Sequence, residues 1–169
     1  LKNAENIYIC FKHRYAMSIE SEIQSKGFLL AQEKTFVNVI FTGAMFYTQI
    51  NIFLKKYNLT EPQYNVLRVL RGSHPKKMLT SDLQSRLLHK SSNATRLLKK
   101  IIDKGLIIST QCKVDKRQYH QLLTPKGLAL LTEIDPHLEK YCLEQITLSS
   151  AKIEQLNSLL DELRKGILQ

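Results

Sequence analysis

The spacing of the apolar residues changes abruptly after Gly105, and this change limits the folds open to the chain. Before that glycine, apolar residues recur every three or four positions, which is typical of amphipathic helices. After it, LIISTQC and QYHQLL are short β-prone runs separated by the charged segment KVDKR. Such a pattern predicts a two-stranded hairpin with a cationic tip. We therefore expect a mainly α-helical fold with one small β-hairpin.

The segment just before the change, SSNATRLLKKIIDKGL, predicts a short helix with two different faces. Wound at about 100° per residue, it separates its side chains cleanly. The apolar arc holds Ala94, Leu97, Leu98, Ile101 and Ile102, and the polar arc holds Ser92, Asn93, Thr95, Arg96, Lys99, Lys100 and Asp103. Ser91 or Ser92 can cap the start, and Gly105 suits the end. Taken alone, the polar arc is equally compatible with an ordinary solvated face.

The charge of the chain is concentrated around this helix. The 169 residues carry a formal net charge of +10. Eleven Lys or Arg and only three acidic residues lie between Lys76 and His120, so this quarter of the chain holds most of the excess. Solubility alone does not require such concentration. A polyanion or an anionic membrane is the kind of partner that it indicates.

Further helices are predicted on both sides of the basic region. Thr60 and Pro62 read as the start of one helix, and Thr80 as the start of a shorter one with Leu83, Leu87 and Leu88 facing inward. Thr124-Pro125 opens a helix that we expect Asp135-Pro136 to kink or interrupt. A last helix starts near Ser149 or Ser150, with apolar residues stepping by three and four.

Residues 35–54 form an uncharged stretch of twenty residues, long enough to span a bilayer. Asn38, Gln49 and Asn51 would each be costly in lipid, so we expect no membrane span. A helix that is apolar nearly all round is otherwise buried on more than one side. We expect this one to pack on its own domain and on a second subunit.

The three cysteines, Cys10, Cys112 and Cys142, show no metal-type spacing and suit a reducing cytoplasm. Cys112 and His120 lie four residues either side of Lys116, where a symmetric hairpin would make them cross-strand neighbours. Two ligands do not make a zinc site, so we expect no metal and no cofactor. Any of the three thiols could sense an oxidant, but a buried thiol that packs as a small hydrophobe is more common.

The order of predicted elements is that of a winged helix-turn-helix. In that arrangement the second helix enters the major groove, and a basic hairpin tip reaches an adjacent minor groove. The runs LTEPQYNVLRVL, LTSDLQSRL, NATRLLKKIIDKGLI and VDKRQYHQLLTPKGLALL resemble the MarR family, the multiple-antibiotic-resistance regulators, over about residues 59–131. The resemblance implies a cytoplasmic homodimer that binds pseudo-palindromic double-stranded DNA, usually as a repressor. It also implies relief by a small-molecule effector or an oxidant.

The resemblance divides the chain into four parts. Residues 17–57 and 125–169 correspond to terminal dimerisation helices, which flank a DNA-binding domain at 58–124. Residues 1–16 are expected to be an N-terminal extension, because Met17 could be the natural start.

The same resemblance assigns roles to individual residues. The recognition helix supplies candidate groove and phosphate contacts from Ser92, Asn93, Thr95, Arg96, Lys99 and Lys100. The wing supplies Lys113, Asp115, Lys116 and Arg117, with Asp115 holding Arg117 in place and Arg117 entering the minor groove. An effector would contact Phe41, Met45, Phe46 and Tyr47, although core packing is the favoured role for these four residues.

Two other classes of protein are alternatives to a DNA-binding regulator. An enzyme is disfavoured because the sequence has no HExxH motif, no phosphate-binding glycine loop and no obvious nucleophile–base pair. A winged-helix module that binds another protein instead of specific DNA is the main alternative. Acidic or apolar residues on the recognition face would favour that module, whereas this face is basic and rich in hydroxyls.

Overall fold

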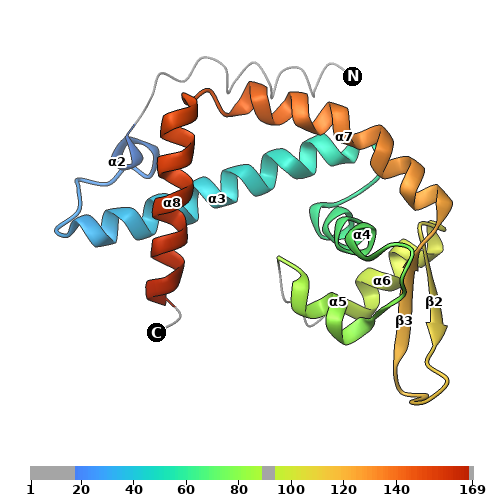
Figure 1. The fold of residues 1–169 in the computed structure, drawn as a ribbon. Coiled ribbons are helices and arrows are strands. Elements are labelled where there is room, and N and C mark those ends of the chain that lie inside the picture. Colours follow the sequence, from blue (N-terminus) through green and yellow to red (C-terminus); the bar gives the residue numbers. More distant parts are fainter. Residues whose placement is uncertain (1–17, 89–93, 168–169) are drawn as a thin grey trace. The chain divides into compact units, whose positions relative to one another are not determined.

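The computed structural model describes residues 18–88 and 94–167 of the chain. Within it, the chain divides into two compact units, one ending at Glu61 and the other beginning at Pro62. The extension at residues 1–16 and the serines expected to cap the recognition helix lie outside the described residues. Helices dominate, and a small three-stranded antiparallel sheet completes the fold (Figure 1).

The first unit contains a short helix α2 (Ile19–Glu22) and a long helix α3 (Ala31–Lys55). Ser18 caps α2 by accepting a hydrogen bond from the Ser21 N–H. The ammonium of Lys34 lies 2.8 Å from the Glu20 carboxylate and so joins the two helices. The Asn51 side chain makes a hydrogen bond within the same unit, because its Oδ1 accepts from the Glu61 N–H at 2.9 Å.

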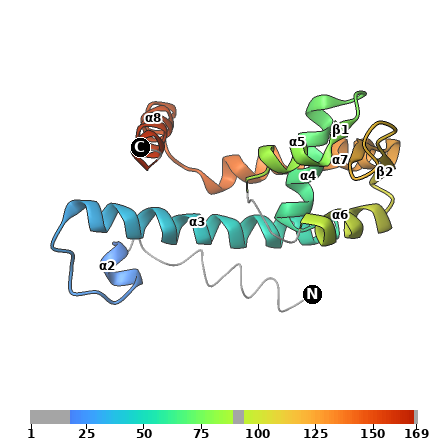
Figure 2. The same ribbon diagram turned by 90° about the horizontal axis from the view of Figure 1, so that it is seen from below.

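The second unit contains the helix-turn-helix. Helix α4 (Glu61–Ser73) starts with Pro62 in its first turn, as expected, and α5 (Thr80–Arg86) and α6 (Ala94–Asp103) follow. Both ribbon views show these helices gathered beside the sheet (Figure 1; Figure 2). Their shared core contains fully buried side chains from each helix, namely Val66, Leu67, Leu70, Leu83 and Ile101. Leu88 was expected to face inward, but 74% of it is exposed because α5 ends two residues earlier.

The sheet has the order β1-β3-β2, where β1 is Met78–Leu79, β2 is Ile107–Gln111 and β3 is Tyr119–Leu123. The hairpin of β2 and β3 was predicted, whereas β1 was not. The expected pairing of Cys112 with His120 is wrong, because His120 lies opposite Thr110. The N–H of Cys112 instead donates to the carbonyl of Gln118, so the hairpin is centred on Asp115 and not on Lys116.

Helix α7 (Pro125–Gln145) begins at Thr124, whose hydroxyl accepts from the Gly127 N–H at 3.0 Å. The expected interruption at Asp135-Pro136 is wrong, since α7 continues through both residues. Asp135 makes an ion pair with Arg71 of α4. The hydrogen bonds to the Asp135 carboxylate raise the pKa of Arg71. The last helix, α8 (Ser150–Ile167), follows a short connection.

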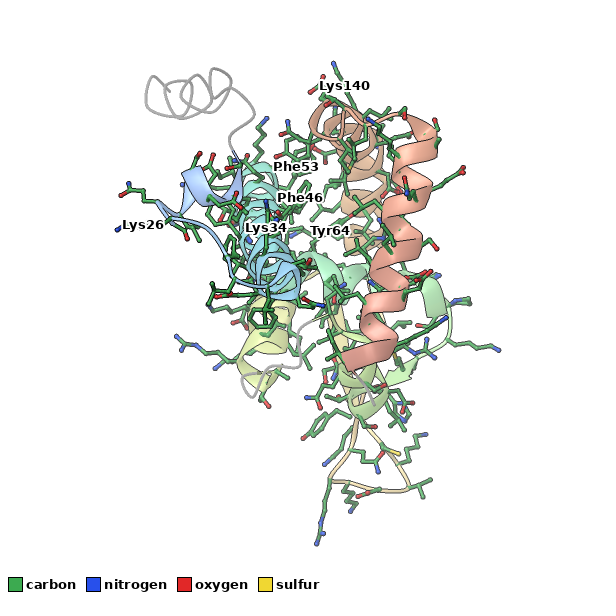
Figure 3. All side chains as sticks on the ribbon, turned by 90° about the vertical axis from the view of Figure 1, so that its left-hand side faces the viewer. Lys26, Lys34, Phe46, Phe53, Tyr64 and Lys140 are labelled. Carbon is green, nitrogen blue, oxygen red and sulfur yellow. The ribbon has the colours of Figure 1, made fainter. Side chains whose placement is uncertain are left out.

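Two helices leave much apolar surface uncovered. Seven large apolar residues of α3 are exposed. Phe46 and Phe53 both project from this helix in Figure 3, but Phe46 is exposed and Phe53 is buried. Helix α8 has no buried residue and exposes Leu156, Leu159, Leu163 and Ile167. By length and composition α3 is also the one helix in residues 18–88 and 94–167 that could cross a membrane.

Candidate nucleic-acid interface

Helix α6 separates its side chains as the sequence predicts, except that Ile102, expected on the apolar face, is 37% exposed. Ala94, Leu98 and Ile101 are buried against the core, and Leu97 is half-buried. The opposite face exposes Thr95, Arg96, Lys99, Lys100 and Asp103. This burial leaves a convex, basic face on a helix of ten residues. Ser92 and Asn93, the remaining candidates on this helix, lie outside the described residues.

The C-terminal end of α6 is held by several hydrogen bonds. Gly105 has φ +70°, the left-handed conformation that ends a helix, and its N–H donates to the Ile102 carbonyl. The Thr124 hydroxyl bonds to the Gly105 carbonyl at 2.8 Å, and Lys126 Nζ donates to the Lys104 carbonyl at the same distance. The start of α7 therefore fixes where α6 ends.

Lys104 belongs to the scaffold of this helix more than to its exposed face. Its Nζ donates to Gln63 Oε1 of α4 at 3.0 Å. Burial, and to a smaller extent the charge of Lys100, lowers the pKa of Lys104. A lysine held in this way helps position α6, and its ammonium is less available to a phosphate than those of the exposed Lys99 and Lys100.

The wing tip presents three exposed cations, Lys113, Lys116 and Arg117. Figure 3 shows nitrogen-tipped side chains extending from this end of the hairpin. Val114 beside them is 96% exposed. In the part of the chain that the structure describes, no carboxylate forms an ion pair with these cations, so their charge is available to a polyanion.

Asp115 organises the backbone of the tip. Its Oδ1 accepts from the Arg117 N–H at 2.9 Å, and its Oδ2 accepts from Gln118 Nε2 at 3.0 Å. The carboxylate thus holds the main chain of Arg117 and leaves the guanidinium exposed. Gln111 adds a further brace, because its Nε2 donates to the Lys116 carbonyl at 2.6 Å.

Sequence reasoning missed these two glutamines and a buried third. Gln121 is 2% exposed in the central strand, and its Nε2 donates to the hydroxyls of Thr80 and Ser109. Thr80 in turn donates to the Tyr119 carbonyl, which ties the start of α5 to the wing. No sequence signal distinguishes these glutamines, since their roles depend on the register of the strands.

The four candidate effector contacts all lie on α3. Phe41 is half-buried, while Met45, Phe46 and Tyr47 are each at least 41% exposed. At about 100° per residue they point to several sides of the helix and do not share one face. Among the described residues, no group of three or more His, Cys, Asp or Glu is placed to hold a metal ion.

Comparison with known proteins gives a consistent result. A sequence profile of the MarR family matches residues 57–118, which contain α4, α5, α6, β2 and the wing tip and end just before β3. The HTH-type transcriptional regulator MgrA of Staphylococcus aureus is 32% identical over 113 residues, covering 65% of this chain and 73% of the relative. The homoprotocatechuate degradative operon repressor of Escherichia coli is 29% identical over 110 residues, covering 64% of this chain and 73% of the relative.

A solved structure agrees with the fold. A MarR family transcriptional regulator from Streptomyces coelicolor, in complex with DNA, superposes with a TM-score of 0.72 at 16% identity. The match covers 83% of this chain and 94% of that one. The predicted winged helix-turn-helix is thereby confirmed. The chain belongs to the MarR family of DNA-binding transcriptional regulators.

Proposed function

We propose that the protein is a cytoplasmic repressor that binds a pseudo-palindromic operator as a homodimer. The observation that carries the proposal is the pair of basic surfaces on one unit: the exposed face of α6 and the braced tip of the wing. A regulator of this family is not an enzyme. Repression is supported by the E. coli relative, whose name describes an operon repressor.

Residue roles within this proposal follow from geometry and charge. Thr95 and Arg96, in the first turn of α6, would enter the major groove with Ser92 and Asn93, because the start of a recognition helix contacts base edges. Lys99 and Lys100 would meet phosphates. Arg117 would enter the minor groove, flanked by Lys113 and Lys116 and held by Asp115.

A second copy of the chain is the proposed cover for the exposed apolar residues of α3 and α8. Many large apolar side chains left exposed along each of these helices indicate association. A two-fold axis would place the same face of each subunit in contact and pair two recognition helices with two half-sites. Analytical ultracentrifugation without detergent tests this: a dimer supports it, while a monomer, or recovery only with membranes, contradicts it.

Relief of repression by a small molecule or an oxidant is part of the same proposal. Phe41, Met45, Phe46 and Tyr47 would contact an apolar or aromatic effector, and the thiol of Cys142 is exposed to oxidants. Operator release by a ligand should be lost in Phe41→Ala, whereas release by peroxide should be lost in Cys142→Ser. Release that neither variant changes would reject these residues as the sensor.

Selection of bound sequences from a random DNA pool, at two salt concentrations, tests the central proposal. An enriched inverted repeat is the expected result. Arg96→Ala should then change preference at one base position by about 1–3 kcal/mol if Arg96 contacts a base. Binding without enrichment that disappears at higher salt would show phosphate contacts alone. No binding at either salt would favour the alternative, a winged-helix module that binds another protein.

A further inference from the structure

Helix α7 changes character at Asp135-Pro136. Before these residues it packs into the second unit, where Gly127, Leu131 and Ile134 are buried. Beyond them, no described residue of α7 or α8 is buried. We call the part from α4 to Ile134 the winged-helix lobe and the part from His137 to Ile167 the exposed arm. Asp135 and Pro136 are thus the junction between the lobe and the arm.

One side-chain pair clamps this junction. Arg71 of α4 donates to both carboxylate oxygens of Asp135, with Nη1–Oδ2 at 2.6 Å and Nη2–Oδ1 at 3.1 Å. A two-bond contact of this kind constrains direction as well as distance. The two side chains are 30% and 40% exposed, so the pair contributes little to global stability. We therefore expect a variant that lacks the pair to remain folded while the direction of the side-chain contact is lost.

The residue after the clamp weakens the helix. Pro136 has no N–H, so it cannot donate to the Thr132 carbonyl one turn earlier, and helices bend most readily at such a position. The clamp lies directly beside the point where α7 bends most easily. Without it, the direction in which the arm leaves the lobe would be less constrained.

We propose that Arg71 and Asp135 form a specificity-determining pair that sets the spacing between the two half-sites of the operator. The proposal rests on the homodimer proposed above, in which the arms help to join two lobes. The angle between arm and lobe then determines how far apart the two α6 helices lie. Two-fold symmetry applies each change in this angle to both lobes. The distance between the two half-sites must match the distance between the two α6 helices, which is about 34 Å for half-sites one DNA turn apart.

The pair acts through the direction of the arm and not through DNA contact. Arg71 is on α4, and its guanidinium is occupied by Asp135. Altering the clamp should therefore leave the sequence of the preferred half-site unchanged. It should alter only the tolerance for different spacers. A loss of stability alone would reduce the affinity for all spacers equally, so the spacer ratio separates the two effects.

The test uses duplexes that carry the selected half-sites with spacers varied one base pair at a time. Arg71→Gln should reduce the affinity ratio between the best spacer and one two base pairs longer by about three- to tenfold, the range for a partly exposed bidentate pair. Arg68→Gln is the matched control. It removes the same charge from the same helix, and among the described residues the Arg68 guanidinium donates within α4, from Nη1 to the Tyr64 hydroxyl at 2.9 Å. It should keep the wild-type ratio.

Asp135→Asn is a second, nearly isosteric substitution that removes the ion pair, for use if Arg71→Gln fails to fold. It should increase the tolerance for different spacer lengths in the same way. A wild-type spacer ratio in a folded clamp variant would overturn the inference. Equal broadening by Arg68→Gln would also overturn it. A wild-type protein with no spacer preference would reject the homodimeric operator as well, which separates failure of the clamp from failure of the proposed function.

Discussion

The role of Asp115 at the wing tip leads to a prediction that distinguishes two mechanisms. The carboxylate accepts one hydrogen bond from the Arg117 N–H and one from the Gln118 side chain. If it acts by holding the backbone, an oxygen at the same position is what matters. If it acts by steering the guanidinium, its negative charge is what matters. Asp115→Ala removes both features, while Asp115→Asn keeps an oxygen and removes the charge.

The magnitude follows from the bonds lost. A typical hydrogen bond contributes about 1 kcal/mol net, so Asp115→Ala would cost at most about 2 kcal/mol in holding the tip. In the variant, binding to DNA has to order the tip again, so the binding free energy becomes less favourable by that amount. This corresponds to an affinity loss of up to about 30-fold. In Asp115→Asn, Oδ1 still accepts from Arg117, and the Gln118 amide can turn to offer its oxygen. Affinity should remain within about threefold of wild type, because a charge that repels phosphates also disappears.

Fluorescence anisotropy with the selected operator measures both variants. In an Arg117→Ala background, Asp115→Ala should add little further loss, since its effect acts through Arg117. An asparagine variant that binds as poorly as the alanine variant would refute the backbone mechanism and favour steering by charge. An alanine variant that binds like wild type would show that the ordered tip contributes nothing to affinity.

Three further predictions concern other parts of the molecule. Arg117→Ala should weaken operator binding and make the fall of log K with log salt shallower by about 1. Unchanged binding across a salt series would reject the wing contact. Gly127→Ala should lower the free energy of unfolding in urea by about 1–3 kcal/mol, because its Cβ would clash with the backbone carbonyl oxygen of Leu106. Gly72→Ala is the control, since its Cβ would meet nothing within 4 Å, and it should be neutral or stabilising. The hydrogen bond from Lys34, followed by smaller ones from the backbone and Ser18, lowers the pKa of Glu20 from 4.5 to about 2, so the stabilising contribution of the ionised carboxylate is present above pH 4.5 and lost as pH falls through 2. Lys34→Gln should bring the NMR-titrated pKa back toward 4.5, and an unchanged pKa would reject the pairing.

The features that sequence could predict are those encoded locally. The apolar positions of α6 are spaced by three and four, so the buried face was predictable without knowing what covers it. Gly105 and Thr124 mark helix ends through their own backbone and side-chain chemistry, and both do so in the structure. The cations of the wing tip were likewise predictable from their place between two β-prone runs.

The features that sequence did not predict depend on contacts between distant segments. Strand β1 has two residues, too few to show any period, and it exists because Met78 and Leu79 pair with β3. The hairpin register depends on the turn around Asp115, which no period encodes. Pro136 usually interrupts a helix, but here α7 continues through it, with Asp135 bonded to α4. The side-chain braces of the wing follow from that register and were missed for the same reason.

Base contact and half-site spacing are assigned to different residues in this molecule. The candidate base contacts lie at the start of α6, whereas the proposed spacing pair lies on α4 and α7. Substitutions at sites that share no partner have additive effects on free energy. Changes at Arg96 and Arg71 should therefore combine independently, one altering the preferred half-site and the other the preferred spacer. A double variant whose half-site preference depended on its spacer would show that the clamp also moves α6 within the lobe, and that one structural change controls both properties.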